Sequence, residues 1–332
     1  MLVLFSVSGM LMAAPTVKFF GYQWLRYTWY QEGAEQDSVS DKNGFNIPRT
    51  YIRTSVKDDD VGYDARLTLD INNVAGAQTG ADWSIWVKYG YVDLYKLIPI
   101  PEMTLRVGLQ NMYFGTVDPW GYPIATSAAF GDRHKIAPAS AEQGVALVGL
   151  IPGGWGEYQL ALYNGAGYKK LEDNTEKMGV ASLLVVPFPS ISVRGSYLRT
   201  NTNAFGQPAK EYSASAVVLN FNSGPISSFV EYNVRTMAKD ASAVKSGVTE
   251  GISSFLGVEI IEGLSVNLRY DMLNPDTMAA RDEKNYYMGS IGYKFDKNLD
   301  IQIAYELEQY KFPSGNPNEN KNTLLVQTKY AW

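Results

Sequence analysis

Apolar and polar side chains alternate one by one along most of the chain. The clearest stretches are residues 61–71, 103–110, 264–271 and 301–308, where every second residue is apolar. A two-residue period puts the apolar side chains on one face of a β-strand and the polar ones on the other. Almost no segment shows the 3.6-residue period of an amphipathic helix. The pattern therefore predicts an all-β chain.

Sixteen segments carry this alternation, and the connections between them are alternately long and short. The long connections are polar and charged, as in 31–45 and 73–82, whereas the short ones carry tight-turn residues, as in 152–154 and 187–189. Short periplasmic turns and longer extracellular loops are typical of outer-membrane barrels. The segments begin near Val17, Asn46, Val61, Trp83, Met103, Glu142, Gly156, Met178, Ile191, Glu211, Ile226, Val248, Leu264, Asn285, Leu299 and Asn322.

An even number of strands brings both ends of the chain to the same side of such a barrel. The roughly 319 residues from position 14 onward give about 20 residues per strand and connection, which suits membrane-crossing strands of about 9–11 residues. We therefore predict a transmembrane antiparallel up-and-down β-barrel of about sixteen strands over residues 14–332. A hairpin hidden in 31–45 or in the third long connection would raise the number to eighteen.

The polar faces of the predicted strands carry too many ionised side chains for a dry core. Burying each of them without a partner would cost several kcal/mol, so we expect a water-filled interior and an apolar outer face. These side chains are Arg26, Arg49, Arg53, Asp64, Arg66, Asp70, Lys88, Arg106, Arg194, Glu231, Glu259, Arg269, Asp271, Glu306 and Lys329. The rings expected to form two interfacial girdles are Tyr27, Trp29, Trp83, Tyr89, Tyr91, Tyr158, Tyr197, Tyr293, Tyr330 and Trp332.

The N-terminal residues predict export. Residues 2–14 form an apolar stretch that ends in small residues, with the length of a signal-peptide core. We expect residues 1–13 to be a signal peptide cleaved after Ala13; a buried N-terminal strand is the alternative. Elsewhere no apolar run reaches the roughly 18 residues that a membrane-spanning helix needs, so none is expected.

The composition excludes several kinds of site. The 332 residues include no Cys and one His, His134, which rules out disulfides, Cys-ligated metals and multi-His metal sites. A formal net charge of −5 gives no basic excess for binding nucleic acid. No Ser or Asp partner for His134 can be identified from spacing, so we expect neither catalysis nor a bound cofactor or metal.

One region resembles a known family. Residues 105–110 (LRVGLQ) and 113–115 (YFG), followed by 142–147 (EQGVAL) and 158–165 (YQLALYNG), are similar to the phosphate-selective porin O and P family. The resemblance implies a sixteen-stranded, typically homotrimeric porin in a Gram-negative outer membrane. The aromatic C-terminus at Trp332 is similar to the assembly signal of outer-membrane proteins. The family commonly has Pro where this chain has Tyr113, and no lysine-rich ladder is found, so the resemblance does not imply phosphate.

The longest connection, 111–141, is the third extracellular loop when loops are counted from a periplasmic N-terminus. In porins the third loop typically folds into the lumen and narrows it, and a loop of this length calls for a functional explanation. We expect the same here, because its rings and prolines favour an ordered segment. An extracellular flap or small interface is the alternative.

The expected constriction has a basic wall, because the basic residues of the first five strands are neighbours in a barrel. The predicted selectivity residues are Arg26, Arg49, Arg53, Arg66, Lys88 and Arg106 on the wall, with Asp118, Asp132, Arg133 and Lys135 in the third loop. Inward acids become commoner later in the chain and would form an opposite wall, including Glu231, Glu259, Asp271, Glu306 and Glu308. Fixed charges select permeating ions at short range. The alternative is that these charges only solvate or pair across the lumen.

These features together predict a channel for passive diffusion of small hydrophilic solutes, with a preference for anions. The expected partners are such solutes, outer-membrane lipid and further copies of the chain. The alternative is a barrel plugged by its own loops that serves as an adhesin, surface-layer anchor or receptor. Steady conductance in a lipid bilayer would separate the two.

Overall fold

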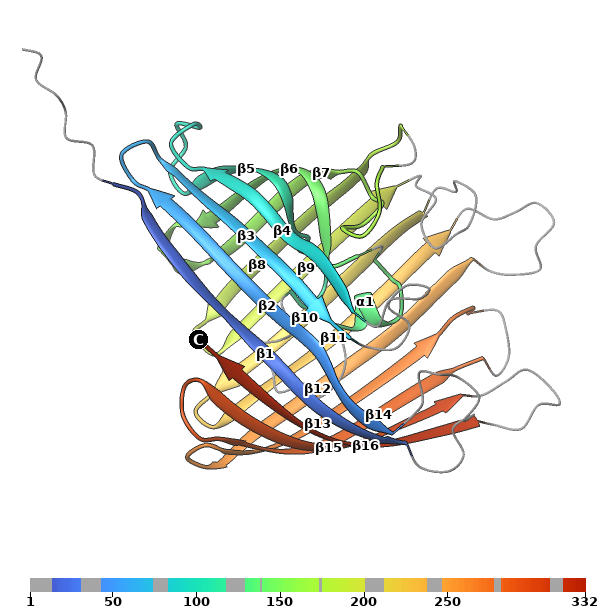
Figure 1. The fold of residues 1–332 in the computed structure, drawn as a ribbon. Helices are drawn as coiled ribbons and strands as arrows, with labels where there is room; N and C mark the ends of the chain where they lie inside the picture. The colour runs from blue at the N-terminus through green and yellow to red at the C-terminus, as the bar shows by residue number, and fades with distance from the viewer. Residues whose placement is uncertain are drawn as a thin grey trace, which may run out of the picture.

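The computed structural model shows a closed barrel of sixteen antiparallel strands (Figure 1). It describes residues 14–30, 43–73, 83–117, 129–137, 139–172, 175–200, 212–237, 247–277, 282–310 and 319–332. The strands are β1 (Thr16–Tyr30), β2 (Gly44–Asp58), β3 (Tyr63–Asn72), β4 (Ser84–Leu94), β5 (Met103–Asn111), β6 (Ala141–Ile151), β7 (Gly156–Tyr163), β8 (Met178–Phe188), β9 (Ile191–Thr200), β10 (Tyr212–Ser223), β11 (Ile226–Met237), β12 (Val248–Ile261), β13 (Leu264–Asn274), β14 (Lys284–Lys294), β15 (Leu299–Tyr310) and β16 (Glu319–Ala331). The predicted strand order and number are confirmed, and the eighteen-strand alternative is wrong.

Two short helices accompany the strands in the described residues. They are α1 (Phe130–Arg133) and the 3-10 turn η3 (Pro152–Gly154). Across the described parts of the chain, no helix is long and apolar enough to cross a membrane. The predicted signal peptide, residues 1–13, lies outside the described residues.

The barrel closes where β1 pairs with β16, from Tyr22 opposite Ala331 to Tyr30 opposite Thr323. At this seam the Gly21 N–H donates to the Trp332 carbonyl (3.2 Å), and the Trp332 N–H donates back to the Gly21 carbonyl (3.1 Å). A Cβ at position 21 would collide with the Tyr51 carbonyl oxygen and the Trp332 ring, so the seam requires glycine here. Closure leaves no unpaired sheet edge.

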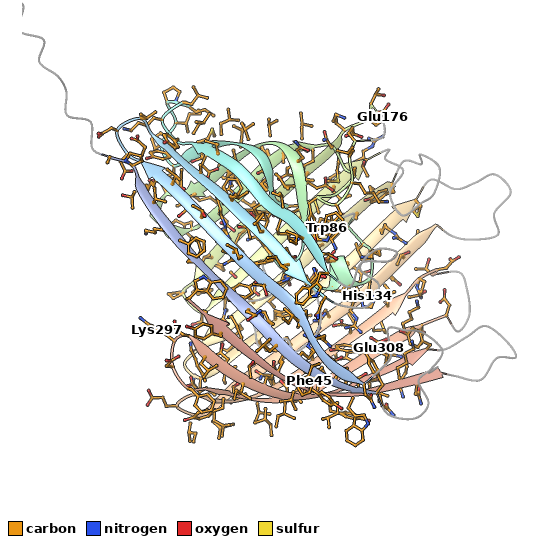
Figure 2. The ribbon with its side chains drawn as sticks, viewed as in Figure 1. Phe45, Trp86, His134, Glu176, Lys297 and Glu308 are labelled. Atoms are coloured by element: carbon orange, nitrogen blue, oxygen red, sulfur yellow. The ribbon has the colours of Figure 1, made fainter. Side chains whose placement is uncertain are left out.

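The two faces of the barrel wall have opposite character. Val217 and Leu219 on β10 are 51% and 47% exposed, whereas Glu231 and Asp271 on the inner face are buried. Phe45 likewise lies on the outer surface (Figure 2). In water, these exposed apolar side chains would be unfavourably hydrated, whereas lipid would cover them. A closed barrel can lie in lipid because its strands satisfy all backbone hydrogen bonds among themselves. The chain is a multi-pass β-barrel of the outer-membrane type.

Two of the rings expected in the interfacial girdles lie in the lumen instead. Between Thr68, opposite Tyr89, and Leu69, opposite Val87, the register of β3 and β4 shifts by one residue. This β-bulge reverses the alternation of β4, so Tyr89 and Tyr91 face inward. There their ring centroids lie 5.2 Å and 4.3 Å from the guanidinium carbons of Arg66 and Arg106, respectively. A strict two-residue period cannot anticipate the extra residue. The other predicted rings are outward and at least partly exposed: Tyr27, Trp29, Trp83, Tyr158, Tyr197, Tyr293, Tyr330 and Trp332.

We predict a depth-dependent cost for charge on the outer face of β11. Val230→Arg, near the middle of the strand, should make folding into a bilayer less favourable by about 2–4 kcal/mol, because a guanidinium replaces an apolar group at the centre of the lipid. Ile226→Arg, at the end of the same strand, should cost only about 0–1 kcal/mol. Urea titration of folding into lipid vesicles measures both; equal costs would contradict a lipid-facing wall.

Candidate functional site

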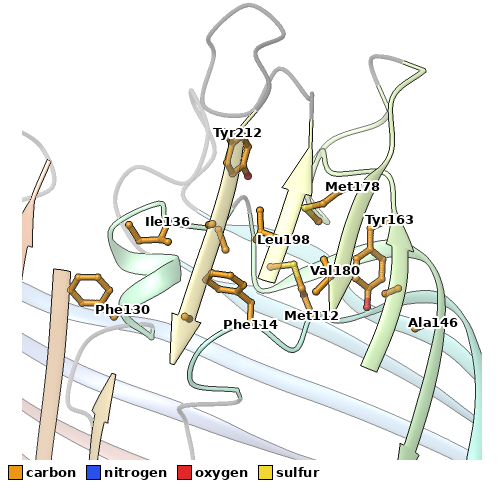
Figure 3. Packing of buried hydrophobic residues seen from close by; sticks show 14 of the residues in the cluster. Met112, Phe114, Phe130, Ile136, Ala146, Tyr163, Met178, Val180, Leu198 and Tyr212 are labelled. Carbon is orange, nitrogen blue, oxygen red and sulfur yellow. The ribbon is translucent and has the colours of Figure 1, made fainter. Parts of the chain in front are cut away.

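The segment between β5 and β6 is here called loop 3, and its described residues, 112–117, 129–137 and 139–140, lie inside the barrel. Met112, Phe114, Phe130 and Ile136 of loop 3 are almost fully buried. They pack on the inner surface of β6–β10 (Figure 3). The wall side of this cluster consists of Ala146, Ala161, Tyr163, Met178, Val180, Leu198, Tyr212, Ala214 and Ala216. The inner face is therefore apolar on this part of the barrel, because loop 3 covers it and keeps it dry.

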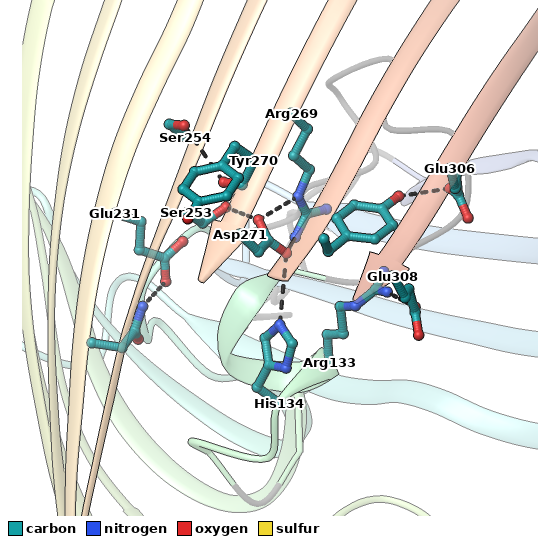
Figure 4. Close-up of polar contacts among 12 residues, drawn as sticks. Arg133, His134, Glu231, Ser253, Ser254, Arg269, Tyr270, Asp271, Glu306 and Glu308 are labelled. Carbon is teal, nitrogen blue, oxygen red and sulfur yellow. Dashed lines mark hydrogen bonds and ion pairs between the residues drawn. The ribbon is translucent and has the colours of Figure 1, made fainter. Parts of the chain in front are cut away.

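Loop 3 also makes polar contacts with the next part of the wall, from β11 to β15 (Figure 4). The Thr116 hydroxyl donates to Glu231 Oε2 on β11 (2.6 Å). Arg133 forms an ion pair with Glu308 on β15. The described residues of loop 3 therefore lie in the lumen, as predicted, and the extracellular-flap alternative does not hold for them.

Phe130, the first residue of α1, packs against the backbone of β12 at Gly251. A Cβ at Gly251 would collide with the Phe130 ring and with the Met272 carbonyl oxygen. Glycine at this position therefore lets the aromatic ring lie against the strand backbone. The ring fixes the end of α1 that precedes Asp132 and Arg133, two of the predicted selectivity residues.

The acids on the far wall are held by neighbouring side chains. Arg269 donates to both oxygens of Asp271, at 2.9 and 2.8 Å, and the Ser253 hydroxyl donates to Oδ1 at 2.6 Å. The Tyr286 hydroxyl donates to Glu306 at 2.6 Å. Charge-assisted hydrogen bonds of this kind stabilise buried carboxylates. Of the predicted acidic wall, Glu231, Asp271, Glu306 and Glu308 face the lumen, and their contacts are mainly with neighbouring wall residues and loop 3. Glu259 is instead exposed near the end of β12, where it accepts a hydrogen bond from the Gly263 N–H.

Two of the predicted basic residues are paired with acids on their own wall. Arg106 donates to both carboxylate oxygens of Asp93, at 2.6 and 2.8 Å. Arg49 Nη2 lies 3.6 Å from Asp70 Oδ2. Arg26 donates from Nε and Nη2 to the Gln327 amide oxygen, at 3.1 and 2.9 Å. The pairing alternative therefore holds for Arg49 and Arg106, although the pairs form along one wall and not across the lumen.

Three other cations of the basic wall are held by rings and hydroxyls. The Arg53 guanidinium carbon lies 4.9 Å and 4.8 Å from the ring centroids of Tyr22 and Tyr51, a cation–π arrangement. Arg66 stacks on Tyr89 and donates to the Thr68 hydroxyl at 3.3 Å. Lys88 is 3% exposed and donates to the Ser140 hydroxyl at 2.5 Å.

Among the described residues, no carboxylate lies within 4.0 Å of the charged nitrogens of Arg53, Arg66 or Lys88. Their positive charge is therefore not cancelled by direct contact. Aromatic faces fix the direction of these side chains without neutralising them.

Four of the predicted selectivity residues line two pockets beside loop 3. Arg49, Lys88 and Asp132 line one pocket between loop 3 and the wall. Arg133, with His134, lines a second pocket against β14 and β15. Lys135 is exposed, and its carbonyl accepts a hydrogen bond from Arg235 at 2.6 Å. Asp118 lies outside the described residues.

Sequence reasoning missed the tyrosines that hold the cations and the apolar cluster that holds loop 3. The cluster had a signal, since residues 178–188 and 212–219 carry apolar or small residues at most positions on both faces of the strand. Within the described ranges, no group of three or more His, Asp and Glu side chains is placed to hold a metal ion.

No family model and no curated protein matches the chain. Its fold is similar to three solved outer-membrane proteins. The anion-selective porin from Comamonas acidovorans has a TM-score of 0.66 at 15% identity, over 96% of this chain and 100% of that chain. OmpF of Salmonella typhi, in complex with daunomycin, has a TM-score of 0.66 at 12% identity, over 96% and 98%. The trimer form of OmpT of Vibrio cholerae has a TM-score of 0.65 at 11% identity, over 96% and 100%. At these identities the likeness shows a porin-like barrel fold.

We predict that the single histidine titrates below its usual pKa. Burial lowers the pKa of His134, although Asp271, whose Oδ2 lies 3.7 Å from Nε2, opposes the shift. Because the pKa is lower when loop 3 is docked, docking should be most stable above about pH 6.5 and lose stability as the pH falls toward the lowered pKa.

Nuclear magnetic resonance of the ¹³C-labelled imidazole measures this pKa without assignment, because the chain has one His. Asp271→Asn should lower the midpoint further, since it removes the carboxylate that favours the imidazolium. The urea-unfolded chain provides the reference value. A midpoint at or above that reference would contradict the buried position of the ring.

Proposed function

We propose that the chain forms a water-filled outer-membrane channel for passive diffusion of small hydrophilic solutes, with a preference for anions. The observation that carries the proposal is the distribution of ion pairs inside the barrel. Arg53, Arg66 and Lys88 have no carboxylate at ion-pair distance within the described part of the chain, whereas Asp271 pairs with Arg269 and Glu308 pairs with Arg133. The likeness to an anion-selective porin supports the same reading.

The proposed mechanism is sieving followed by electrostatic selection. Loop 3 narrows the lumen and directs solutes past the wall formed by β1–β4. Arg suits carboxylate and phosphate groups there because its planar fork donates two parallel hydrogen bonds. No covalent step and no cofactor enters this mechanism.

Three further features belong to the same proposal. We propose that residues 1–13 direct export, that the barrel resides in a Gram-negative outer membrane, and that three copies assemble. The OmpT structure of similar fold is a trimer form, which supports the assembly. Membership of the phosphate-selective porin O and P family would fit the same architecture.

A plugged barrel is the second candidate, because loop 3 contacts both β6–β10 and β11–β15. Such a barrel would serve as an adhesin, anchor or receptor. Reconstitution in a planar bilayer separates the candidates: the channel should give steady conductance steps, and a plugged barrel should give none.

We predict that Arg53→Gln with Arg66→Gln reduces anion preference. At about 8 Å in water each charge contributes about 0.5 kcal/mol, which corresponds to about a twofold change in ion preference for each residue removed. The reversal potential in a KCl gradient measures the ratio of chloride to potassium permeability. The charge-neutral double variant Arg106→Gln with Asp93→Asn is the control, because it removes a cation together with the acid that it contacts. A wild-type channel without anion preference, or equal effects of the two double variants, would contradict the proposal.

A further inference from the structure

We propose that the pocket between loop 3 and the inner wall of β2 and β4 binds a monocarboxylate that carries an apolar body. The pocket has a volume of about 50 Å³ and is lined by charged side chains on the wall and by apolar side chains on loop 3. The inference rests on the proposed channel function, since the solute would reach the pocket through the lumen.

The charged side of the pocket contains a buried ammonium group without a counter-ion. Lys88 Nζ lies 3.9 Å from the Tyr168 ring centroid and donates to the Ser140 hydroxyl at 2.5 Å. Within the described residues, no carboxylate lies at ion-pair distance from it. Burying a charge without a partner costs several kcal/mol. An anion in the adjoining space would remove much of this cost.

Arg49 supplies a second cation to the same pocket. Its Nη2 faces Asp70 at 3.6 Å, and its guanidinium carbon lies 4.8 Å from the Tyr51 ring centroid. These contacts fix the guanidinium in place. An ammonium and a guanidinium on one wall favour a planar carboxylate, which can accept hydrogen bonds from both.

The loop side of the pocket argues against a purely inorganic anion. Met112, Phe114, Val117, Ala129 and Ala137 line it. Met112, Phe114 and Ala137 are already buried, but a phosphate or chloride ion would leave the partly exposed Val117 and Ala129 in contact with water. An apolar body on the ligand would bury them, at about 25 cal/mol for each Å² removed from water.

Asp132 of α1 lines the same pocket and limits the charge of the ligand. Because Arg49 already faces Asp70, Lys88 is the cation left to contact a ligand carboxylate, and a second ligand charge would be repelled by Asp132. A monoanion therefore fits better than a dicarboxylate or a phosphate dianion. A hydroxyl on the ligand could donate to the Asp132 carboxylate.

Equilibrium binding to the purified full-length barrel in detergent tests the proposal. The probes are benzoate, acetate and inorganic phosphate, followed by isothermal titration calorimetry. Benzoate should bind at least tenfold more tightly than either of the others. Lys88→Met should weaken benzoate binding at least tenfold, because it removes the ammonium and keeps an unbranched apolar side chain.

Lys329→Met is the matched control. Lys329 contacts the rings of Tyr22 and Trp24, outside the pocket, so benzoate binding should be unchanged. Val117→Ala tests the apolar side independently of Lys88, because Val117 lines the pocket outside the cluster that holds loop 3. It should weaken benzoate binding several-fold while acetate binding stays the same. The two variants change opposite sides of the pocket, so misfolding of one leaves the other informative.

Three results would overturn the inference: benzoate binding no tighter than acetate, phosphate binding tighter than benzoate, or equal effects of Lys88→Met and Lys329→Met. Conductance in KCl, recorded on the same preparations, separates this failure from that of the proposed function. Steady conductance without benzoate binding would overturn the pocket assignment alone, whereas absence of conductance would overturn the channel.

Discussion

Pairing every strand with two neighbours is the constraint on which the rest of this molecule depends. In lipid, an unpaired backbone N–H or C=O group costs several kcal/mol, so the sheet must close. The seam between β1 and β16 achieves this with reciprocal hydrogen bonds between Gly21 and Trp332. Because closure satisfies the backbone within the sheet and the apolar side chains face outward, the interior does not have to form an apolar core.

The interior uses this freedom in two ways. One sector, the inner face of β6–β10, is a small dry core that holds loop 3 by apolar contact. The other sector is charged, and its cations are oriented by tyrosines and by hydroxyl groups. Loop 3 depends on the first sector for its position and lines a pocket together with Arg49 and Lys88 of the second.

The sequence predicts the wall of the barrel far better than it predicts the site. Strand boundaries follow from the two-residue alternation, because lipid on one side and water on the other impose it on nearly every strand. Inward placement of Arg53 and Arg66 follows for the same reason. The alternation does not predict which cations have an acidic partner. The pairing of Arg106 with Asp93, for example, depends on the register between β4 and β5. The contact of Phe130 with Gly251 joins segments more than a hundred residues apart, and no local pattern encodes it.

The β-bulge in β4 has a consequence for how such a pore diversifies. Lys88 is an extra residue in the β3–β4 ladder. Even-numbered side chains of β4 therefore face the lumen before the bulge, and odd-numbered side chains face it after the bulge. Insertion or deletion of one residue at this point would turn the inward side chains of half a strand outward and the outward ones inward, while strand number and barrel closure stay the same. One such event can therefore change several pore-lining residues at once, whereas point substitutions would have to change them one by one.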